Sequence, residues 1–426
     1  MSNTSGFYSD LHELIISDYL RVEKSHIFYE LMNEMEQVPS LASPNIFMMI
    51  RPRGFGLSLC SEALYSVLER TRDFTSALRD DEAREKSESL PRHHVLMLNL
   101  KKVSSRNTAE FREQLLLMLQ QLYWEHHLHG AITNYTTPRR YFADLINELS
   151  ERHNEKIVVL IDNYDIPLIM ASMMHEEQRS ECTALYLEML NVLKHAKDKV
   201  QYVFLTGHIK FRLASILSEG LPLVRDISAS DKYDTLFGFT HDELVSVFGK
   251  QLERVAVKHD LPKEAGVALI EKFYGNFAFS DQLLHVTCPV CVNHVLSNDC
   301  RLYPYSSGGD YAFLRRSLLG STDDLSWLFG KDGQDPLFAS AIDFIPAGKD
   351  LGTLLLQLGF ATRERVTEHK QDFFSTWRYR YICPNEDMRR SLEIVRGNQD
   401  PSYALQEMDI TEEFKAELED EIHKNA

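Results

Sequence analysis

The stretch NIFMMIRPRGFGLSLCSEAL (residues 45–64) predicts a buried strand, a turn and the start of a helix. Residues 46–50 are all apolar, two glycines follow, and apolar residues then recur at helical spacing. A turn in this position can aim backbone N–H groups and the positive end of the helix at a phosphate. The lysine of a phosphate-binding loop is absent, because Leu57 stands between Gly56 and Ser58. Two glycines before a helix also fit a tight connection that binds nothing.

The composition is that of an ordinary globular protein. The chain has 426 residues, enough for two or three domains, and is 44% hydrophobic and 26% charged. Its formal net charge of -17 argues against broad non-specific binding to nucleic acid, which requires Lys and Arg to displace counterions. Six scattered cysteines, no secretory leader and no membrane-length apolar run favour a cytoplasmic protein, and secretion into a host cell stays open.

Four short apolar runs alternate with helix-period segments across the first 250 residues. Such alternation is typical of a parallel sheet flanked by helices, in which ligands bind beyond the carboxyl ends of the strands. Residues 72–93, which are rich in charge, are expected to form a mobile excursion. The four runs are residues 46–50, 94–100, 157–161 and 201–207.

The chain is expected to have four parts: an α/β core (1–240), a helical subdomain (241–340), a small winged-helix-like module (341–397) and an acidic tail (398–426). Thr240 and Glu243 predict a capping box at the start of the second part. The third part has the order helix, hairpin, helix.

The acidic tail carries an amphipathic stripe of apolar residues spaced four apart. This stripe is a candidate site for binding a protein partner, and packing against the chain's own body is the alternative. Its members are Ile410, Phe414, Leu418 and Ile422.

Asp162 ends the third apolar run, within VVLIDNYDIPL (residues 158–168). An acid at the end of a strand, opposite the loop of the first strand, can order Mg²⁺ and its waters in phosphoryl-transfer proteins. Active ATPases usually follow this acid with a glutamate that orients the attacking water, and this chain has Asn163. Asp162 could instead cap the next turn.

Together the two motifs resemble the bacterial AAA-ATPase-like family, whose members carry RPRRFGKS and LIDEYDKP and often a C-terminal PD-(D/E)XK-type nuclease domain. Other segments similar to that family follow in the same order, from about residue 7 to 397, and no nuclease cluster follows Val395. The similar segments include YVFLTGHIKFRLASILSEGL (202–221), DISASDKYDTLFGFTHDEL (226–244) and YRYICPNEDMRRSL (379–392).

The resemblance implies a P-loop NTPase-like (AAA-ATPase-like) α/β fold. It also implies vestigial nucleotide-binding positions, of which Thr206 would sense the phosphate. These positions are Arg51, Arg53, Gly54, Gly56, Ser58, Asp162 and Thr206.

The departures from the family pattern indicate lost catalysis. Gly54 replaces an arginine, Leu57 the lysine and Asn163 the glutamate. Losing the lysine removes a charge-assisted contact of roughly 1.5–3 kcal/mol, or about one to two decades of affinity. The leading hypothesis is therefore a pseudo-ATPase that serves as a protein-interaction or regulatory module, with no catalytic residue and at most weak ATP and Mg²⁺ binding. The alternatives are a divergent Mg-dependent NTPase using Arg51 or Arg53 in place of the lysine, or a nucleotide-gated binder.

The cysteines and histidines of the chain raise the question of a metal site. The segment around CPVC suggests zinc, but its candidate ligands crowd into sixteen residues without a second pair, so no metal site is predicted. The candidate zinc ligands are His285, Cys288, Cys291, His294 and Cys300.

Cys60 is expected to be a buried core cysteine rather than a reactive thiol.

A basic group in the small module allows a third hypothesis, a nucleic-acid-binding regulator. The acidic tail that follows argues against it, so the expected partner is a protein and neither nucleic acid nor a membrane. The basic group is Arg378, Arg380, Arg389 and Arg390.

Overall fold

The structure is a computed structural model, and it describes most of the chain. The described residues are 22, 24–39, 44–71, 80–103, 105, 107–128, 137–211, 224–308, 311–319, 325–329, 349–371, 374–397 and 405–425.

The contacts divide the chain into two compact units. The turn after the first strand belongs by its contacts to the second unit, although the strand and helix on either side of it belong to the first. The first unit comprises Met1–Tyr19, Glu23–Ile50 and Leu57–Ile227, and the second Leu20–Val22, Arg51–Gly56 and Ser228–Ala426.

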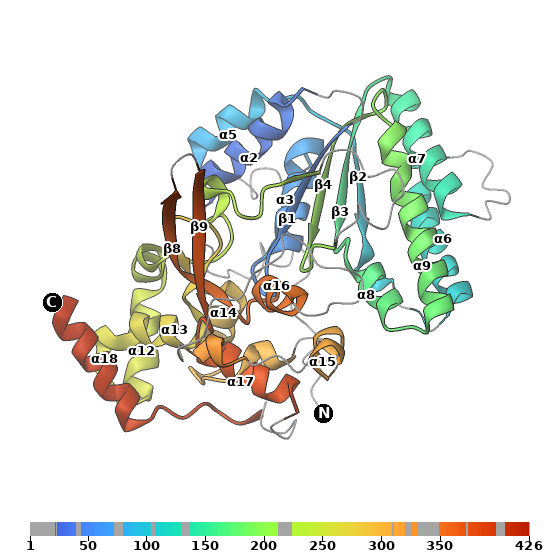
Figure 1. Cartoon of the computed structure of the whole chain (residues 1–426). Coiled ribbons are helices and arrows are strands. Elements are labelled where there is room, and N and C mark those ends of the chain that lie inside the picture. The colour runs from blue at the N-terminus through green and yellow to red at the C-terminus, as the bar shows by residue number, and fades with distance from the viewer. Residues whose placement is uncertain are drawn as a thin grey trace. The chain divides into compact units, whose positions relative to one another are not determined.

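The first unit is built on a five-stranded sheet in the order β2-β3-β4-β1-β5 (Figure 1). Every neighbouring pair of strands in it is parallel. This arrangement confirms the predicted α/β class. The strands are β1 (Asn45–Ile50), β2 (Val95–Asn99), β3 (Ile157–Asp162), β4 (Val200–Gly207) and β5 (Val224–Asp226).

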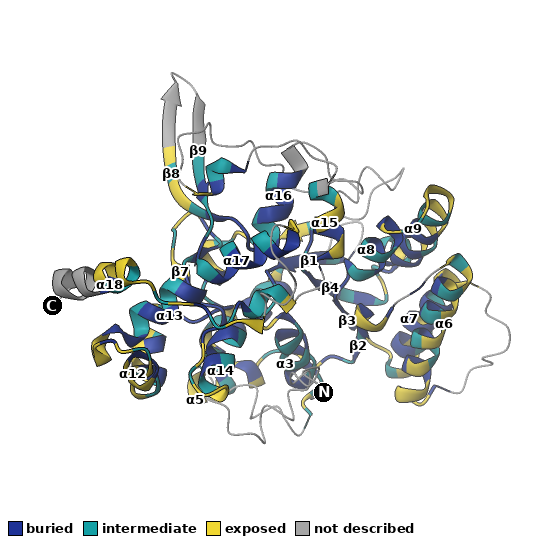
Figure 2. Cartoon of the chain, turned by 90° about the horizontal axis from the view of Figure 1, so that it is seen from below, coloured by how far each residue is buried: buried dark blue, intermediate teal, exposed yellow. Residues whose placement is uncertain are grey.

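The four predicted apolar runs all form strands because both of their faces are covered. All residues of β3 are buried, as are all but the first residue of β1, and Figure 2 shows these strands in the buried class. The fifth strand, β5, was not predicted. It has only three residues, two of them exposed, so it carries no apolar pattern.

Helices flank the sheet. Helix α3 contacts β2, β3 and β4, while α6, α7 and α9 pack against one another (Figure 1). The helices of this unit are α2 (Ser25–Gln37), α3 (Leu57–Glu69), α5 (Asp81–Glu88), α6 (Thr108–Glu125), α7 (Pro138–His153), α8 (Ile166–Ser172) and α9 (Glu176–Leu190).

Residues 72–93 are expected from the sequence to form a mobile excursion, but helix α5 lies in the second half of this stretch. The Asp80 carboxylate caps this helix by accepting a 2.7 Å hydrogen bond from the Ala83 N–H. Ala83 and Ser87 are buried, which gives the charged helix one packed side.

The second unit is mainly helical, with two antiparallel hairpins, β6–β7 and β8–β9. Thr240 and Glu243 form the predicted capping box. The order helix, hairpin, helix predicted for the small module is found as α16, β8–β9 and α17. The elements used below are α12 (Gly249–Lys258), α13 (Gly266–Tyr274), β6 (Phe277–Ala278), β7 (His285–Val286), α14 (Pro289–Ser297), η6 (Tyr305–Gly308), α16 (Lys349–Gln357), β8 (Thr362–Gln371), β9 (Phe374–Ile382), α17 (Glu386–Val395) and α18 (Glu412–Asn425).

Candidate functional site

The turn between β1 and α3 keeps the backbone geometry of a glycine loop. Gly54 and Gly56 have φ angles of 87° and 85°, a region that favours glycine. Leu57 is the first residue of α3 and its side chain is buried. Ser58 is half-buried, and its hydroxyl makes no hydrogen bond to any described residue. The turn therefore keeps its shape, with an apolar side chain packed away at the lysine position.

Arg51 is a structural residue of the second unit. Its guanidinium is buried and donates hydrogen bonds to the carbonyls of Ser228 (2.6 Å) and Tyr233 (3.2 Å). It also lies over the rings of Phe279, at 4.3 Å from the centroid, and Phe237, at 5.4 Å. Because these contacts use its donors and its flat face, Arg51 is a poor substitute for the missing lysine.

Arg53 is placed differently. It is half-buried, and it forms no ion pair or hydrogen bond with the residues that the structure describes. Its charge acts on Tyr311, where burial raises the pKa and Arg53 opposes that rise. Among the arginines of the turn, Arg53 is thus the cation that could still meet an anion.

Asp162 lies at the end of β3 with both carboxylate oxygens occupied. Thr206 Oγ1 donates to Asp162 Oδ1 (2.7 Å), and Asn163 Nδ2 donates to Asp162 Oδ2 (2.8 Å). Since the Thr206 proton points to Asp162, the Ser61 hydroxyl donates in turn to Thr206 (3.3 Å). Asn163 also contacts Asn99 Oδ1 at 3.4 Å. The predicted residues Asp162 and Thr206 are thus brought together in one buried network.

Sequence reasoning missed Ser61 and Asn99. Asn99 ends β2 just as Asp162 ends β3, and the two are register partners in the parallel pair. Polar residues at the ends of neighbouring parallel strands meet at the same edge of a sheet, so the ending of the second apolar run was a usable signal. Ser61 lies one turn into α3 and carries no comparable signal.

The geometry does not fit a magnesium–nucleotide complex well. Mg²⁺ takes oxygen ligands in a near-octahedral shell and usually retains several waters. Asp162 is 1% exposed, and internal donors already bind both of its oxygens. Each oxygen keeps a further lone pair, but the carboxylate is almost completely buried, and Leu57 supplies no charge for the phosphates.

The residues after Asp162 in the motif VVLIDNYDIPL (158–168) support the loop after β4. Asp165 is fully buried, and its Oδ2 accepts hydrogen bonds from the N–H groups of His208 and Ile209, both at 2.9 Å. Burial raises the pKa of Asp165. The Tyr164 hydroxyl donates to the Ile209 carbonyl (2.8 Å). A Cβ on Gly207 would lie 2.6 Å from Asp165 Oδ1, so a side chain there would clash. This part of the family motif is therefore structural in this chain.

Cys60 lies in the core of the first unit, as expected. Burial, with a smaller contribution from the Asp162 carboxylate, raises its pKa to about 12. A thiol with this pKa is a weak nucleophile at neutral pH.

The five candidate zinc ligands have different environments in the structure. Cys288 and Cys291 are buried thiols, Cys300 is half-buried, and His285 lies in β7. His294 stacks on Tyr305 at 4.4 Å between ring centroids, and burial lowers its pKa to about 4. Within the described ranges, no group of three or more His, Cys, Asp or Glu residues is arranged to hold a metal ion.

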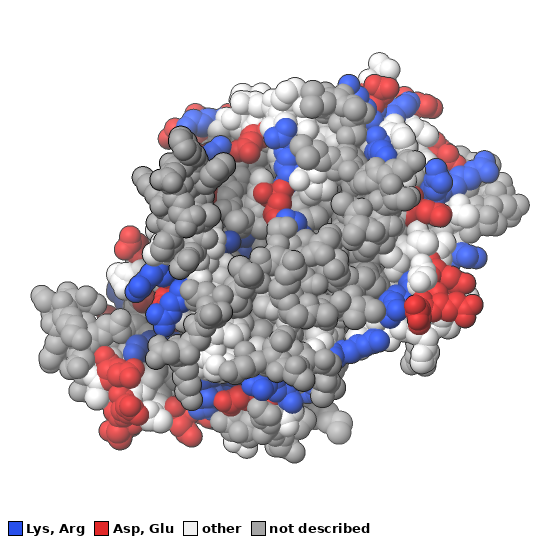
Figure 3. Space-filling model, in the orientation of Figure 1, with Lys and Arg blue, Asp and Glu red and all other residues white. Residues whose placement is uncertain are grey.

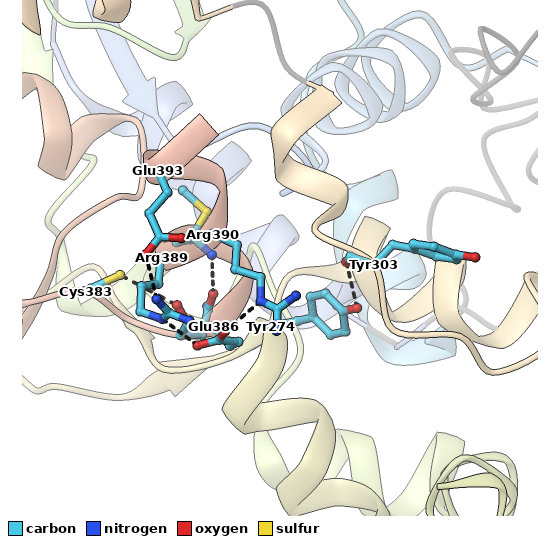
Figure 4. Close-up of polar contacts among 9 residues, drawn as sticks. Tyr274, Tyr303, Cys383, Glu386, Arg389, Arg390 and Glu393 are labelled. Atoms are coloured by element: carbon cyan, nitrogen blue, oxygen red, sulfur yellow. Dashed lines mark hydrogen bonds and ion pairs between the residues drawn. The ribbon is translucent and has the colours of Figure 1, made fainter. Parts of the chain in front are cut away.

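The arginines of the small module are paired with glutamates. Arg389 binds Glu386 (2.6 Å) and Glu393 (2.7 Å), and Arg390 binds Glu386 (2.8 Å), as Figure 4 shows. Burial would raise the pKa of Glu386, but hydrogen bonds from the two arginines outweigh burial and lower it. Their positive charge is therefore largely neutralised within α17 and is poorly suited to phosphate binding.

The same pairing extends to β9, where Arg380 binds Glu364 at 2.8 Å. The side chain of Arg378 lies outside the described residues. On the face seen in Figure 3, described Lys and Arg side chains are interspersed with Asp and Glu. That face shows no continuous basic stripe among its described atoms.

The apolar stripe of the tail lies partly against its own chain. Phe414 packs edge-on against Phe273 of α13, with 5.2 Å between centroids. Lys272 lies 5.1 Å from the Phe414 ring and pairs with Glu417 at 2.9 Å. Leu418 is fully buried. Ile410 is half-buried, and the side chain of Ile422 lies outside the described residues. Partner binding through Phe414 and Leu418 would require α18 to leave α13.

A parallel sheet with a glycine turn after its β1 strand and an aspartate at the end of β3 defines a P-loop NTPase-like core. Residues 8–217, just under half of the chain, match the model of the AAA-ATPase-like family, described as "Predicted AAA-ATPase".

Two similar proteins add detail. An uncharacterized protein in the vnfD 5' region of Azotobacter chroococcum mcd 1 is 25% identical over 238 residues, which is 55% of this chain and 42% of that protein. The chain thus spans less than half the length of this relative. The chain is also similar to a chain in the solved structure of Drosophila ORC bound to GC-rich DNA and Cdc6. The match covers 61% of this chain and 38% of the other, at 11% identity and a TM-score of 0.27. Among the helices that the structure describes, none combines the length and hydrophobicity that a membrane crossing requires.

Proposed function

We propose that this chain is a catalytically degenerate member of the AAA-ATPase-like family that acts as a protein-interaction or regulatory module. The observation that carries the proposal is the closed hydrogen-bond network of Asp162. Thr206 and Asn163 each donate a hydrogen bond to one oxygen of the buried carboxylate at the position where an ATPase has its metal-binding acid. Asn163 thus takes the place of the glutamate that positions water and at the same time bonds the neighbouring aspartate.

Two features of the turn support the same proposal. The lysine position holds the buried Leu57, and the nearby Arg51 is bound to the carbonyls of Ser228 and Tyr233. Neither residue supplies charge to a terminal phosphate. The turn keeps the architecture of a nucleotide site, while the groups that performed its chemistry have taken structural roles.

The test is ATP hydrolysis by the purified full chain, compared with Asp162→Ala and Ser58→Ala. We expect all three proteins to release phosphate at the same background rate. A wild-type rate that is clearly above both variants would overturn the proposal in favour of a divergent Mg-dependent NTPase. Circular dichroism of each variant controls for folding, because Asp162→Ala leaves the Thr206 hydroxyl and the Asn163 amide without their acceptor.

One observation favours a second candidate, a nucleotide-gated binder. Arg53 is half-buried and has no ion-pair partner among the described residues, so it could meet a phosphate without turnover. This candidate predicts that Mg-ATP raises the Tm of the wild type and not that of Arg53→Ala. If Mg-ATP changes the Tm of neither protein, this second candidate is wrong and the first proposal, a module without nucleotide control, is kept.

A further inference from the structure

The segment CPVC (residues 288–291) lies at the start of α14 in the second unit. Cys288 is the N-cap residue, with an extended backbone at φ -64° and ψ 114°, and Pro289 is the first helical residue. Cys291 follows three residues later, so both side chains lie on the same side of the first turn. Both thiols are free and buried.

Each of these thiols touches a different part of the second unit. Cys288 Sγ lies 3.7 Å from the carbonyl oxygen of Gly54, and the Val290 N–H donates to the same oxygen at 3.3 Å. A Cβ on Gly54 would lie 2.8 Å from that sulfur. The Cys288 sulfur is therefore in direct contact with the glycine turn 51–56.

Cys291 faces a buried carboxyl group. Its Sγ lies 3.8 Å from Asp387 Oδ2, and Asp387 is held by the Ser306 hydroxyl (2.5 Å) and the Ser306 N–H (3.1 Å). A hydrogen bond with Cys288, together with burial, raises the pKa of Cys291. The two thiols are thus in hydrogen-bond contact with each other, and Cys288 is the one that contacts the turn.

We propose that Cys288 and Cys291 form a redox-modification site, in which a peroxide converts the two thiols into a disulfide and thereby loosens the turn 51–56 from α14. In the first step the Cys288 sulfur attacks hydrogen peroxide, the O–O bond breaks, and Cys288 sulfenic acid and water form. In the second step the Cys291 sulfur displaces the hydroxyl of the sulfenic acid, which gives the disulfide and a second water. The two thiols are oxidised by two electrons and the peroxide is reduced by two.

The geometry explains why the turn would respond. A disulfide needs Cβ atoms about 3.5–4.5 Å apart, whereas residues three apart on a helix have Cβ atoms about 5–6 Å apart. The adjustment falls on Cys288, because Cys291 lies inside the helix and Cys288 does not. Oxidation also removes the S–H group that faces the Gly54 carbonyl. Since both cysteines are buried, the oxidant that fits is a small peroxide rather than a bulky disulfide.

The experiment treats the full wild-type chain with hydrogen peroxide and analyses it without reduction. We expect an intact mass lower by two hydrogen atoms, a peptide carrying a Cys288–Cys291 bond, and reversal by dithiothreitol. Hydrogen exchange of the oxidised chain should be roughly fivefold faster at the Val290 amide, which donates to the Gly54 carbonyl, as expected for the loss of one hydrogen bond. This comparison of oxidised with reduced wild type needs no variant and so cannot fail through misfolding.

Two variants make the assignment specific. Cys291→Ser should abolish both the mass change and the faster exchange, while Cys300→Ser should change neither. Cys300 is a suitable control because it is a free, half-buried cysteine of the same unit. Oxidation of Cys300 without a Cys288–Cys291 bond would overturn the proposal. A Cys288–Cys291 bond that leaves exchange at the Val290 amide unchanged would overturn the link to the turn. Neither readout depends on nucleotide.

Discussion

The Thr206 hydroxyl donates a 2.7 Å hydrogen bond to the Asp162 carboxylate, and both side chains are almost completely buried. Asp162 is the last residue of β3, and Thr206 is the last but one of the neighbouring strand β4, at the edge of the sheet where ligands of open parallel sheets bind. In this chain they bond each other, together with Asn163 and Ser61. These hydrogen bonds thus link the carboxyl ends of β3 and β4.

The first prediction concerns Thr206. Thr206→Val removes the hydroxyl and leaves an Asp162 oxygen buried without its donor, so we expect a loss of about 1–3 kcal/mol in the free energy of unfolding. Urea unfolding followed by circular dichroism measures this loss. Thr206→Ser, which keeps the hydroxyl, should lose clearly less than Thr206→Val. Equal losses in the two variants would show that packing rather than the hydrogen bond decides the effect.

The second prediction separates the two arginines of the turn. Arg51→Ala removes two hydrogen bonds, to the carbonyls of Ser228 and Tyr233, and the contact with Phe279, so we expect a loss of about 3 kcal/mol or more. Arg53→Ala, which removes no hydrogen bond or ion pair among the described residues, should change stability by about 0.5 kcal/mol or less. Thermal and urea unfolding of both variants provide the comparison, and similar losses would contradict the structural role of Arg51.

The third prediction is a pH dependence that originates at Asp387. Burial raises the pKa of this carboxyl group from 3.8 to about 7. Between these two values the folded chain holds the proton more tightly than the unfolded chain. The contribution of Asp387 to stability is therefore fully present below the unfolded pKa and is lost as the pH rises through about 7.

Urea unfolding of the wild type and Asp387→Asn from pH 5 to 8 tests this sign. Asparagine does not titrate, so the stability of Asp387→Asn relative to the wild type should increase with pH, with a slope of at most about 1.4 kcal/mol per pH unit. A stability difference that does not change over this range would show that Asp387 is ionised in the folded chain throughout.

The fourth prediction concerns α18. Phe414→Ala removes the ring contact with Phe273 and the contact with Lys272, so we expect the docking of α18 to weaken by about 1–3 kcal/mol. Hydrogen exchange at residues 412–418 should become faster, and the second unit should keep its fold. Lys415→Ala is the matched control, because it removes a local ion pair with the exposed Glu412 and keeps the Phe414 ring. Unchanged exchange in Phe414→Ala would mean that the ring of Phe414 does not hold the helix.

Local pattern predicted much of the fold. Four apolar runs became β1 to β4, Thr240 and Glu243 formed their capping box, and the hairpin of the small module was found as β8–β9. These features depend on residues close together in the chain, which periodicity and capping rules describe. Helix α5 and strand β5 were missed because the first is highly charged and the second has only three residues.

The candidate site was predicted less completely. The order of its motifs was enough to select Asp162, Thr206 and the glycine turn, whereas Ser61 and Asn99 entered only through the packing of α3 and β2 near β3. Arg51 was a candidate phosphate ligand in the sequence. The structure bonds it to carbonyls that lie 177 and 182 residues away along the chain. No local rule anticipates contacts of that separation.

The sequence by itself thus determined the class of sheet, the position of the glycine turn and the absence of the lysine and glutamate, because each is a matter of residue type and local order. Only the tertiary structure decided what the remaining polar groups do. A buried carboxylate or guanidinium must find partners, and folding brings Thr206 and Asn163 to Asp162 and two distant carbonyls to Arg51. Those partners are set by the three-dimensional packing of strands and loops, which the order of residues does not display.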